Sequence, residues 1–147
     1  VMLMRAEALV ELGRLEDARS IINDIRSRAA DSVDKNISYA KDFCEIALYS
    51  SSDFSSKDKA RVRLQWERRL EMAMESSRYF DLRRWGIAST VLNAYFEKEK
   101  DSSYDGVKYG QYYEDAHYTP GKNEFYPIPY NQLYYVPGLY VQNQGYN

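Results

Sequence analysis

The chain has 147 residues, of which 44% are hydrophobic, and this is the usual size of one globular domain with a buried core. Its formal net charge of -2 excludes a global positive field of the kind that attracts nucleic acid or an anionic membrane. Cys44 is the only cysteine and His117 the only histidine, which excludes an intrachain disulfide and leaves too few ligands for a structural zinc site.

The beginning of the chain has no targeting or membrane-spanning pattern. No apolar run approaches the roughly 18 residues that a transmembrane helix needs, and no charged segment precedes an apolar one as in a signal peptide. The opening "VMLMRAEAL" starts inside a helical pattern without an initiator methionine or an N-cap residue. We interpret the chain as a fragment whose signal or lipid anchor would lie upstream.

The first two predicted elements are helices joined into an antiparallel hairpin. Residues 2–12 form a helix with two apolar faces, which predicts neighbours on both sides. Gly13 ends this helix, because glycine takes the left-handed conformation at little cost, and residues 15–29 form a second helix with one apolar stripe. The faces of the first helix are Leu3, Ala6 and Val10, and Met4, Ala8 and Leu12; the stripe of the second is Ala18, Ile21, Ile22, Ile25 and Ala29.

This hairpin resembles one tetratricopeptide-type unit in its small alanines and in its turn "ELGRLEDA". A single unit of this kind cannot bury both of its faces alone and needs stacked neighbours. The sequence therefore predicts a mainly α fold built from tetratricopeptide-like helical hairpins.

The middle of the chain predicts a loop and two further helices. Residues 31–56 are rich in serine and aspartate and indicate a loop, interrupted by a short apolar piece. Ser56 is placed to cap a long helix that ends near Ser77, and after a break at Gly86 another helix covers about residues 87–100. The main apolar face of the long helix is Val62, Trp66, Leu70 and Ala73; the following helix carries Ile87, Val91, Leu92, Tyr95 and Phe96.

The composition changes beyond Asp101. Residues 101–147 hold eleven of the fifteen tyrosines, all four prolines and five of the seven glycines. Prolines remove backbone donors and force extended backbone before them, so this segment cannot be a long helix, while its dense aromatics argue against disorder. We predict one domain, with residues 1–100 as its helical part and residues 101–147 as a loop-rich, aromatic C-terminal segment.

The acidic residues of the long helix allow two interpretations. Glu67, Glu71 and Glu75 recur at every fourth position and could supply the acid/base pair of a glycosidase. Arginines crowd the segment "ESSRYFDLRRWG" at residues 75–86, so a structural ion-pair network that joins two helices is the favoured interpretation. The predicted network consists of Glu67, Glu71, Glu75, Arg78, Asp81, Arg83 and Arg84, with Tyr79, Phe80 and Trp85 packed between the helices.

Other enzyme and nucleic-acid classes lack their motifs. A serine hydrolase is poorly supported, because His117 lies in the tyrosine-rich segment and no nucleophile-elbow glycines surround a serine. No GxGxxG or P-loop pattern is present to hold a nucleotide, and no cofactor is expected. The basic "RRW" with nearby tyrosines would suit RNA, but the interleaved acids favour a segment paired with itself.

Tyrosines of the C-terminal segment are candidates for sugar contacts. An aromatic ring stacks on the apolar C–H face of a sugar, and tyrosine adds a polar hydroxyl at the rim. Such contacts are usually displayed on loops. The candidates are Tyr104, Tyr109, Tyr112, Tyr113 and Tyr118, each of which could instead serve in packing.

Four sequence blocks follow one another along the chain: "LMRAEALVELGRLEDARSIINDIRSRAA", "ERRLEMAMESSRYFDLRRWG", "FYPIPYNQL" and "QNQGY". In this order they resemble the C-terminal part of the SusD/RagB-like outer-membrane nutrient-binding lipoproteins of Bacteroidetes, over the whole chain. Three departures from the family pattern concern turns. Ser76 and Ser77 stand where the family usually has glycine and a polar residue, Val136-Pro137 replaces Asn-Pro, and Gln144 replaces the proline of the terminal block.

The resemblance implies an extracellular-facing, lipid-anchored protein that binds a nutrient and is not an enzyme. It would capture an oligosaccharide, or less often a peptide or other nutrient, and hand it to a SusC-like TonB-dependent transporter. Its contact with the membrane would be only the lipid anchor, which lies outside these residues. The ligand sites of the family vary, and no motif-matched sugar contact carries over to this chain.

Two other functions stay open at this point. A tetratricopeptide-like protein-interaction module would need several more helix pairs of about 34 residues without the C-terminal blocks. A glycosidase would need the helix acids for turnover.

Overall fold

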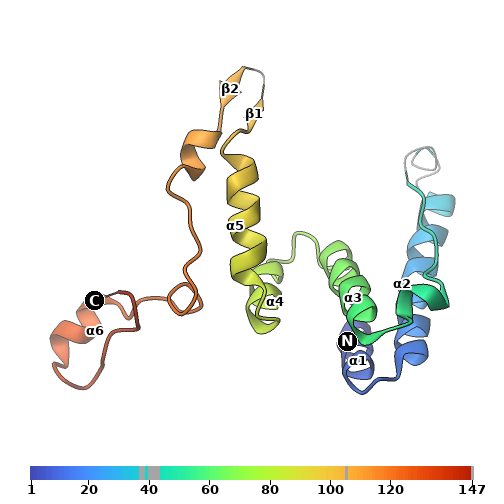
Figure 1. Ribbon diagram of the computed structural model, residues 1–147, viewed down its shortest axis with the longest axis horizontal. Helices are drawn as coiled ribbons and strands as arrows, with labels where there is room; N and C mark the ends of the chain where they lie inside the picture. Colours follow the sequence, from blue (N-terminus) through green and yellow to red (C-terminus); the bar gives the residue numbers. More distant parts are fainter. Residues whose placement is uncertain (37–38, 40–43, 105, 147) are drawn as a thin grey trace. The chain divides into compact units, whose positions relative to one another are not determined.

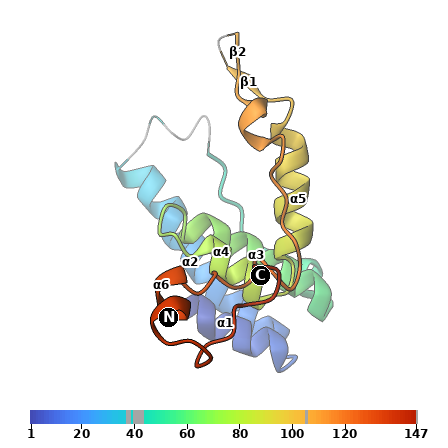
Figure 2. The same cartoon turned by 90° about the vertical axis from the view of Figure 1, so that its left-hand side faces the viewer.

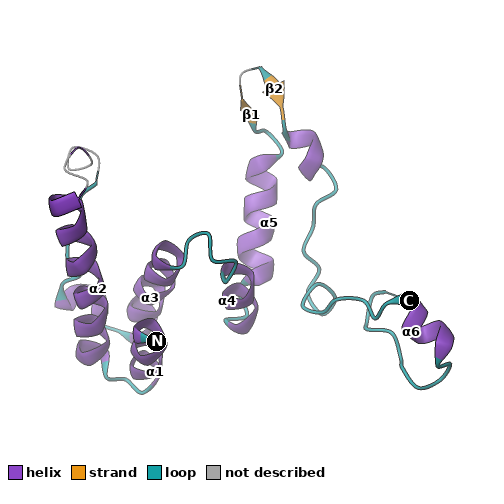
Figure 3. Ribbon diagram, turned by 180° about the vertical axis from the view of Figure 1, so that it is seen from behind, coloured by secondary structure: helices purple, strands orange, loops and turns teal. Residues whose placement is uncertain are grey.

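The computed structural model of the protein describes residues 1–36, 39, 44–104 and 106–146. Within these ranges it is mainly helical with a single two-stranded sheet (Figure 1 and Figure 3), which confirms the predicted mainly α fold. No helix in the described part is long and apolar enough to cross a membrane. The chain divides into two compact units, residues 1–76 and 77–147. The assignment of the whole chain to one domain stays a prediction.

The predicted helical hairpin opens the first unit. α1 (Met2–Glu11) and α2 (Leu15–Asn36) pack side by side and run antiparallel (Figure 1). Gly13 has a φ of 78°, and the amide of the next residue bonds to the Leu9 carbonyl at 2.9 Å, so glycine ends α1 as expected. α2 continues past the expected residue 29, because neither glycine nor proline interrupts the chain before Asn36.

One hydrophobic core holds α1, α2 and α3 (Lys57–Glu71) together. It also takes in Phe54, from the short 3-10 helix η2 (Ser51–Phe54) that precedes α3. The buried core residues are Leu3, Ala6, Leu9, Val10, Ala18, Ile22, Ile25, Phe54, Ala60 and Leu64. Met4 and Leu12 are exposed, so α2 and α3 cover only one of the two apolar faces of α1, and a neighbour for the second face stays a prediction.

α3 buries a different face from the expected one. Its start is as predicted, because the Ser56 hydroxyl accepts a hydrogen bond from the Lys59 amide at 3.3 Å. The expected apolar face, Val62, Trp66, Leu70 and Ala73, is exposed, and the buried residues are Ala60, Leu64 and Glu67. The apolar pattern missed this face because a glutamate occupies one of its core positions.

α3 also ends earlier than the expected Ser77. Its last residue is Glu71, and in the turns that follow Met74 and Ser76 have left-handed φ angles of 67° and 58°. Serine is a weak helix former that favours caps and turns over helix interiors. The helix therefore stops before the two consecutive serines, and the backbone takes a conformation there that suits glycine better.

Replacing Ser76 by glycine is expected to stabilise the protein. A left-handed conformation costs a side-chain-bearing residue roughly 1–2 kcal/mol that glycine avoids, and the greater entropy of glycine in the unfolded chain offsets part of this. We expect the free energy of unfolding to rise by about 0.5–1 kcal/mol. Ser77→Gly is the matched control, because Ser77 has a φ of -81° and gains no relief. Denaturant unfolding measures both variants, and a lower midpoint for Ser76→Gly than for the parent contradicts the prediction.

The second unit is built on α4 (Arg78–Arg84) and α5 (Ala88–Glu99). Gly86 has a φ of 69°, and the amide of Ile87 bonds to the Leu82 carbonyl at 3.0 Å, which repeats the glycine turn at the end of α1. The predicted break and the helix after it are confirmed. A small core joins Leu82, Ala88 and Tyr118 to partly buried Tyr79, Ile87, Val91, Leu92 and Phe96.

Side-chain bonds to the backbone order the last part of the chain. The amide of Gln142 bonds to both the N–H and the carbonyl of Ile128, at 2.8 and 3.0 Å, and Asn143 donates to the Tyr126 carbonyl at 2.6 Å. The sequence blocks "FYPIPYNQL" and "QNQGY" therefore lie against each other. Short regular elements along this part are β1 (Ser103–Tyr104), β2 (Val107–Lys108), η3 (Gly110–Tyr113) and α6 (Tyr130–Tyr135).

Candidate functional site

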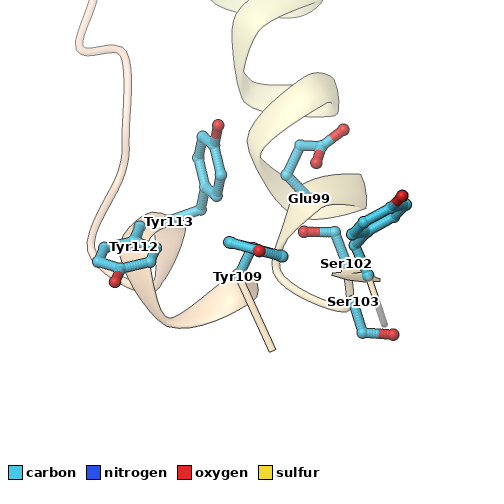
Figure 4. Close-up of a pocket in the computed structure, with 7 residues that line it drawn as sticks. Glu99, Ser102, Ser103, Tyr109, Tyr112 and Tyr113 are labelled. Atoms are coloured by element: carbon cyan, nitrogen blue, oxygen red, sulfur yellow. The ribbon is translucent and has the colours of Figure 1, made fainter. Parts of the chain in front are cut away.

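A hollow of about 490 Å³ lies at the C-terminal end of α5, within the second unit, and we name it the tyrosine hollow. It brings together four of the five candidate tyrosines. Its lining consists of Glu99, Ser102, Ser103, Tyr104, Tyr109, Tyr112 and Tyr113. In Figure 4, Tyr112 and Tyr113 lie on one side of the hollow, Glu99, Ser102 and Ser103 lie on the other, and Tyr109 lies between the two groups.

A β-hairpin brings Tyr104 to this hollow. β1 and β2 pair antiparallel with Tyr104 opposite Val107, and the hairpin extends beyond the end of α5 (Figure 2). The returning chain is fixed where the Tyr109 amide bonds to the Ser102 carbonyl at 3.0 Å. Sequence reasoning missed this hairpin, although "YDGV" carries a signal for it, since Asp-Gly between β-forming residues is typical of tight hairpins.

Gly110 sets η3 against the end of α5. A Cβ atom at this position would lie 1.6 Å from the carbonyl oxygen of Lys100, which is backbone and cannot swing aside. The Gly110 amide also bonds to the Ser102 carbonyl, at 3.3 Å. Tyr112 and Tyr113 follow on the same turn, so the positions of both rings depend on the absence of a Cβ atom at Gly110.

Aromatic residues of α5 hold the Tyr113 ring in place. The ring meets Tyr95 edge-on, with centroids 5.9 Å apart, and stacks on Phe96 with centroids 6.3 Å apart. The Tyr113 hydroxyl, then burial and the Glu99 carboxylate, raise the pKa of Tyr95 above its usual value. Tyr113 is therefore a fixed wall of the tyrosine hollow.

The other groups in the hollow suit a ligand with an apolar face and hydroxyl groups. Tyr104 and Tyr112 are 75% and 74% exposed, so their rings are open to stacking. The Ser102 hydroxyl oxygen is buried and, among the described residues, has no hydrogen-bond partner. Buried polar atoms normally have partners, so a ligand hydroxyl could complete this one, while Glu99 offers a carboxylate acceptor. Sequence reasoning missed Ser102 and Glu99, which no motif marks.

The fifth candidate, Tyr118, lies elsewhere. It is buried in the core of the second unit, where its amide bonds to the Asn93 side chain at 2.7 Å. Burial, then the carboxylate of Glu124, raises the pKa of Tyr118 to about 12. Its ring borders a separate hollow of about 400 Å³. The structure thus places Tyr118 in packing, which the sequence had left open.

The predicted acidic residues of α3 bind arginines of α2. Glu67 pairs with Arg26 at 2.9 Å, with the two side chains 6% and 14% exposed, and Glu71 pairs with Arg28 at the surface. Glu75 lies beyond the end of α3, so the three glutamates do not form the helical stripe on which the glycosidase alternative rested. Within the described residues, no group of three or more His, Cys, Asp or Glu side chains could hold a metal ion.

The predicted basic partners lie on or beside α4. Arg84 binds Asp81 at 2.9 Å one turn apart, and the Arg83 guanidinium lies over the Tyr79 ring at 5.5 Å. Arg78 is the first residue of α4. Phe80 is exposed within its own unit, and its packing against α3 stays a prediction. A network that joins this segment to α3 stays a prediction.

Comparison with known proteins identifies one family. The sequence model described as the SusD family matches residues 1–146 of the chain. A search of curated proteins finds no match to this sequence.

Proposed function

The chain belongs to the SusD family, and on this premise we propose that it captures an oligosaccharide at the cell surface for import. Proteins of this family bind nutrients or glycans at the outer membrane, are not catalysts, and generally work with SusC-like transporters. In this proposal, the protein faces the cell exterior, is held by a lipid anchor outside these residues, and passes its ligand to a SusC-like TonB-dependent transporter.

The observation that carries the glycan proposal is the tyrosine hollow. Four tyrosines that are spread over ten positions of the sequence meet around one space, with a buried serine hydroxyl and a carboxylate beside them. Rings that bind the C–H face of a sugar and polar groups that bind its hydroxyls are the two requirements of carbohydrate recognition. A peptide ligand could use the same rings, and its backbone N–H and C=O groups could bond to the same carboxylate and serine, so the ligand panel decides between the two.

Tyr112→Ala is expected to weaken glycan binding about tenfold, because one aromatic contact contributes about 1.4 kcal/mol, which is a factor of ten in affinity. Tyr130→Ala is the matched control, since both tyrosines are 74% exposed and Tyr130 lies outside the hollow, on α6. Affinity electrophoresis of the full-length protein against a polysaccharide panel finds the ligand, and calorimetry compares the variants. Equal loss of affinity in both variants, or in neither, contradicts a glycan site in the hollow.

The same two variants test delivery to a transporter. In cells supplied with limiting amounts of the bound glycan, uptake is expected to fall with Tyr112→Ala and to stay unchanged with Tyr130→Ala, at equal surface amounts of protein. Each hit in the panel is also checked for product, because turnover would revive the glycosidase alternative.

A protein-interaction module is the second candidate. The observation that favours it is the exposed apolar face of α3, with Val62, Trp66 and Leu70. Such a module would bind no glycan at all, so the polysaccharide panel separates the two functions.

A further inference from the structure

The lining of the tyrosine hollow has a charge of one sign. Of the described residues that line it, Glu99 is the only one with a side chain that is charged at neutral pH. The stretch around it, residues 99–115, contains five carboxylates and two lysines. The formal charge of the described lining is therefore negative, and it comes from Glu99.

Neither of the two lysines cancels the charge of Glu99. Lys100 is paired with Glu97 at 2.7 Å, at the surface. Lys108 lies opposite Ser103 in the hairpin and is not part of the lining. Glu99 itself has no cation among the residues of the hollow, so its charge acts on whatever enters.

The polar groups of the hollow suit a neutral or a cationic sugar better than an anionic one. The Ser102 hydroxyl, buried without a partner, can accept or donate one hydrogen bond. Tyrosine hydroxyls add neutral donors and acceptors. An acidic sugar would bring its carboxylate or sulfate beside Glu99 with no lysine or arginine in the lining to bind it, and two like charges at short range repel.

Building on the proposed glycan function, we infer that the tyrosine hollow selects sugars by charge, taking amino sugars best, neutral sugars next and acidic sugars least. Glu99 is the residue that produces this order. It accepts a charge-assisted hydrogen bond from a protonated sugar amine, which is stronger than a bond to a neutral hydroxyl.

The test compares oligomers of glucosamine, glucose and glucuronic acid of equal length and linkage, binding to the full-length protein at about pH 6, where amines are protonated. We expect each step in this series to lower the affinity about fivefold, the effect of one partly screened unit charge. Glu99→Gln keeps the size of the side chain and should bring the three affinities together. About 0.5 M salt should do the same, since it shortens the reach of the charge.

Lys108→Met provides the matched control. Lys108 is the nearest cation of the hairpin to the lining in the strand register, and its removal should leave the order of the three oligomers unchanged. If Lys108→Met abolishes the order while Glu99→Gln preserves it, the assignment to Glu99 is wrong.

The outcomes separate the inference from the proposed function. Equal affinities, or preference for the acidic oligomer, overturn the charge selection while Tyr112-dependent binding still supports a glycan site. No Tyr112-dependent binding of any oligomer, together with none in the polysaccharide panel, overturns the glycan site itself, and the charge selection with it.

Discussion

Gly110→Ala is expected to abolish glycan binding at the tyrosine hollow. The added methyl group would overlap the backbone carbonyl of Lys100, at 1.6 Å from its oxygen, in a place where the nearest atoms are all backbone. Overpacking of this kind costs about 1–3 kcal/mol, and more where the obstacle cannot move. We expect the overlap to be relieved by movement of η3 away from the end of α5. This movement separates Tyr112 and Tyr113 from Glu99 and Ser102.

Gly106→Ala is the matched control for this prediction. Gly106 lies four positions earlier, between β1 and β2, with a φ of 76°, but a Cβ atom there would meet nothing within 4 Å. It should therefore show only the cost of left-handed backbone, roughly 1 kcal/mol, and retain most of the binding. Calorimetry measures the affinity, and hydrogen exchange of residues 99–113 shows whether η3 has detached. Unchanged affinity and exchange in Gly110→Ala would falsify the account of how the hollow is built.

Glu67→Ala is expected to destabilise the first unit strongly. The pair of Glu67 and Arg26 is almost fully buried, and Arg26 also donates to the Ala47 carbonyl at 2.6 Å and lies over the Tyr49 ring at 4.5 Å. Removal of one partner leaves a buried charge uncompensated, which costs about 3–5 kcal/mol. Arg26 contacts both α3 and the segment before η2. The loss of its partner Glu67 should therefore weaken the packing of both elements.

Glu71→Ala is the matched control for Glu67→Ala. It lies one turn further along α3 and also binds an arginine of α2, Arg28, but the two side chains are 33% and 64% exposed. A surface ion pair is worth up to about 1 kcal/mol. Denaturant unfolding measures both variants. The double variant Arg26→Met with Glu67→Leu should recover most of the stability, because apolar side chains can replace a buried ion pair. Equal effects of Glu67→Ala and Glu71→Ala would contradict the ranking by burial.

Glu67→Ala also bears on the glycosidase alternative. If Glu67 is structural, its replacement lowers the free energy of unfolding and affects no hydrolytic activity. If Glu67 is catalytic, its replacement lowers turnover while the fold is retained. The conservative change Glu67→Gln keeps the volume of the side chain and removes its charge. Its effect on unfolding should lie between those of the parent and Glu67→Ala.

The sequence by itself determined where helices begin and end at several points. Gly13 and Gly86 end α1 and α4 in the same two-bond turn, and Ser56 caps α3. These features depend on the conformational preferences of one residue and on neighbours within one turn, so they can be recognised without a partner from elsewhere. The helical hairpin and the irregular, tyrosine-rich end followed from the same local rules.

The sequence also identified the tyrosines as candidates for ligand binding, but it could not separate those that line the hollow from the one that packs in the core. Tyr109, Tyr112 and Tyr113 come to one hollow because of the hairpin and the contact of Gly110 with Lys100, ten positions earlier in the chain. Tyr118 is five positions beyond Tyr113 and yet packs in the core. From composition, each of these tyrosines is an equal candidate for ligand binding, because composition does not show which ring the backbone turns into the core.

Only the tertiary structure decided which face of α3 is buried. Val62, Trp66 and Leu70 are more hydrophobic than the face that packs on α1 and α2, and a pattern read along one helix selects them. The burial of Glu67 depends on Arg26, 41 positions away, whose charge makes a core position acceptable to a carboxylate. Helix ends depend on local sequence, and several of them were predicted. Burial and ion pairing depend on residues that are distant in the sequence, and only the fold brings those residues together.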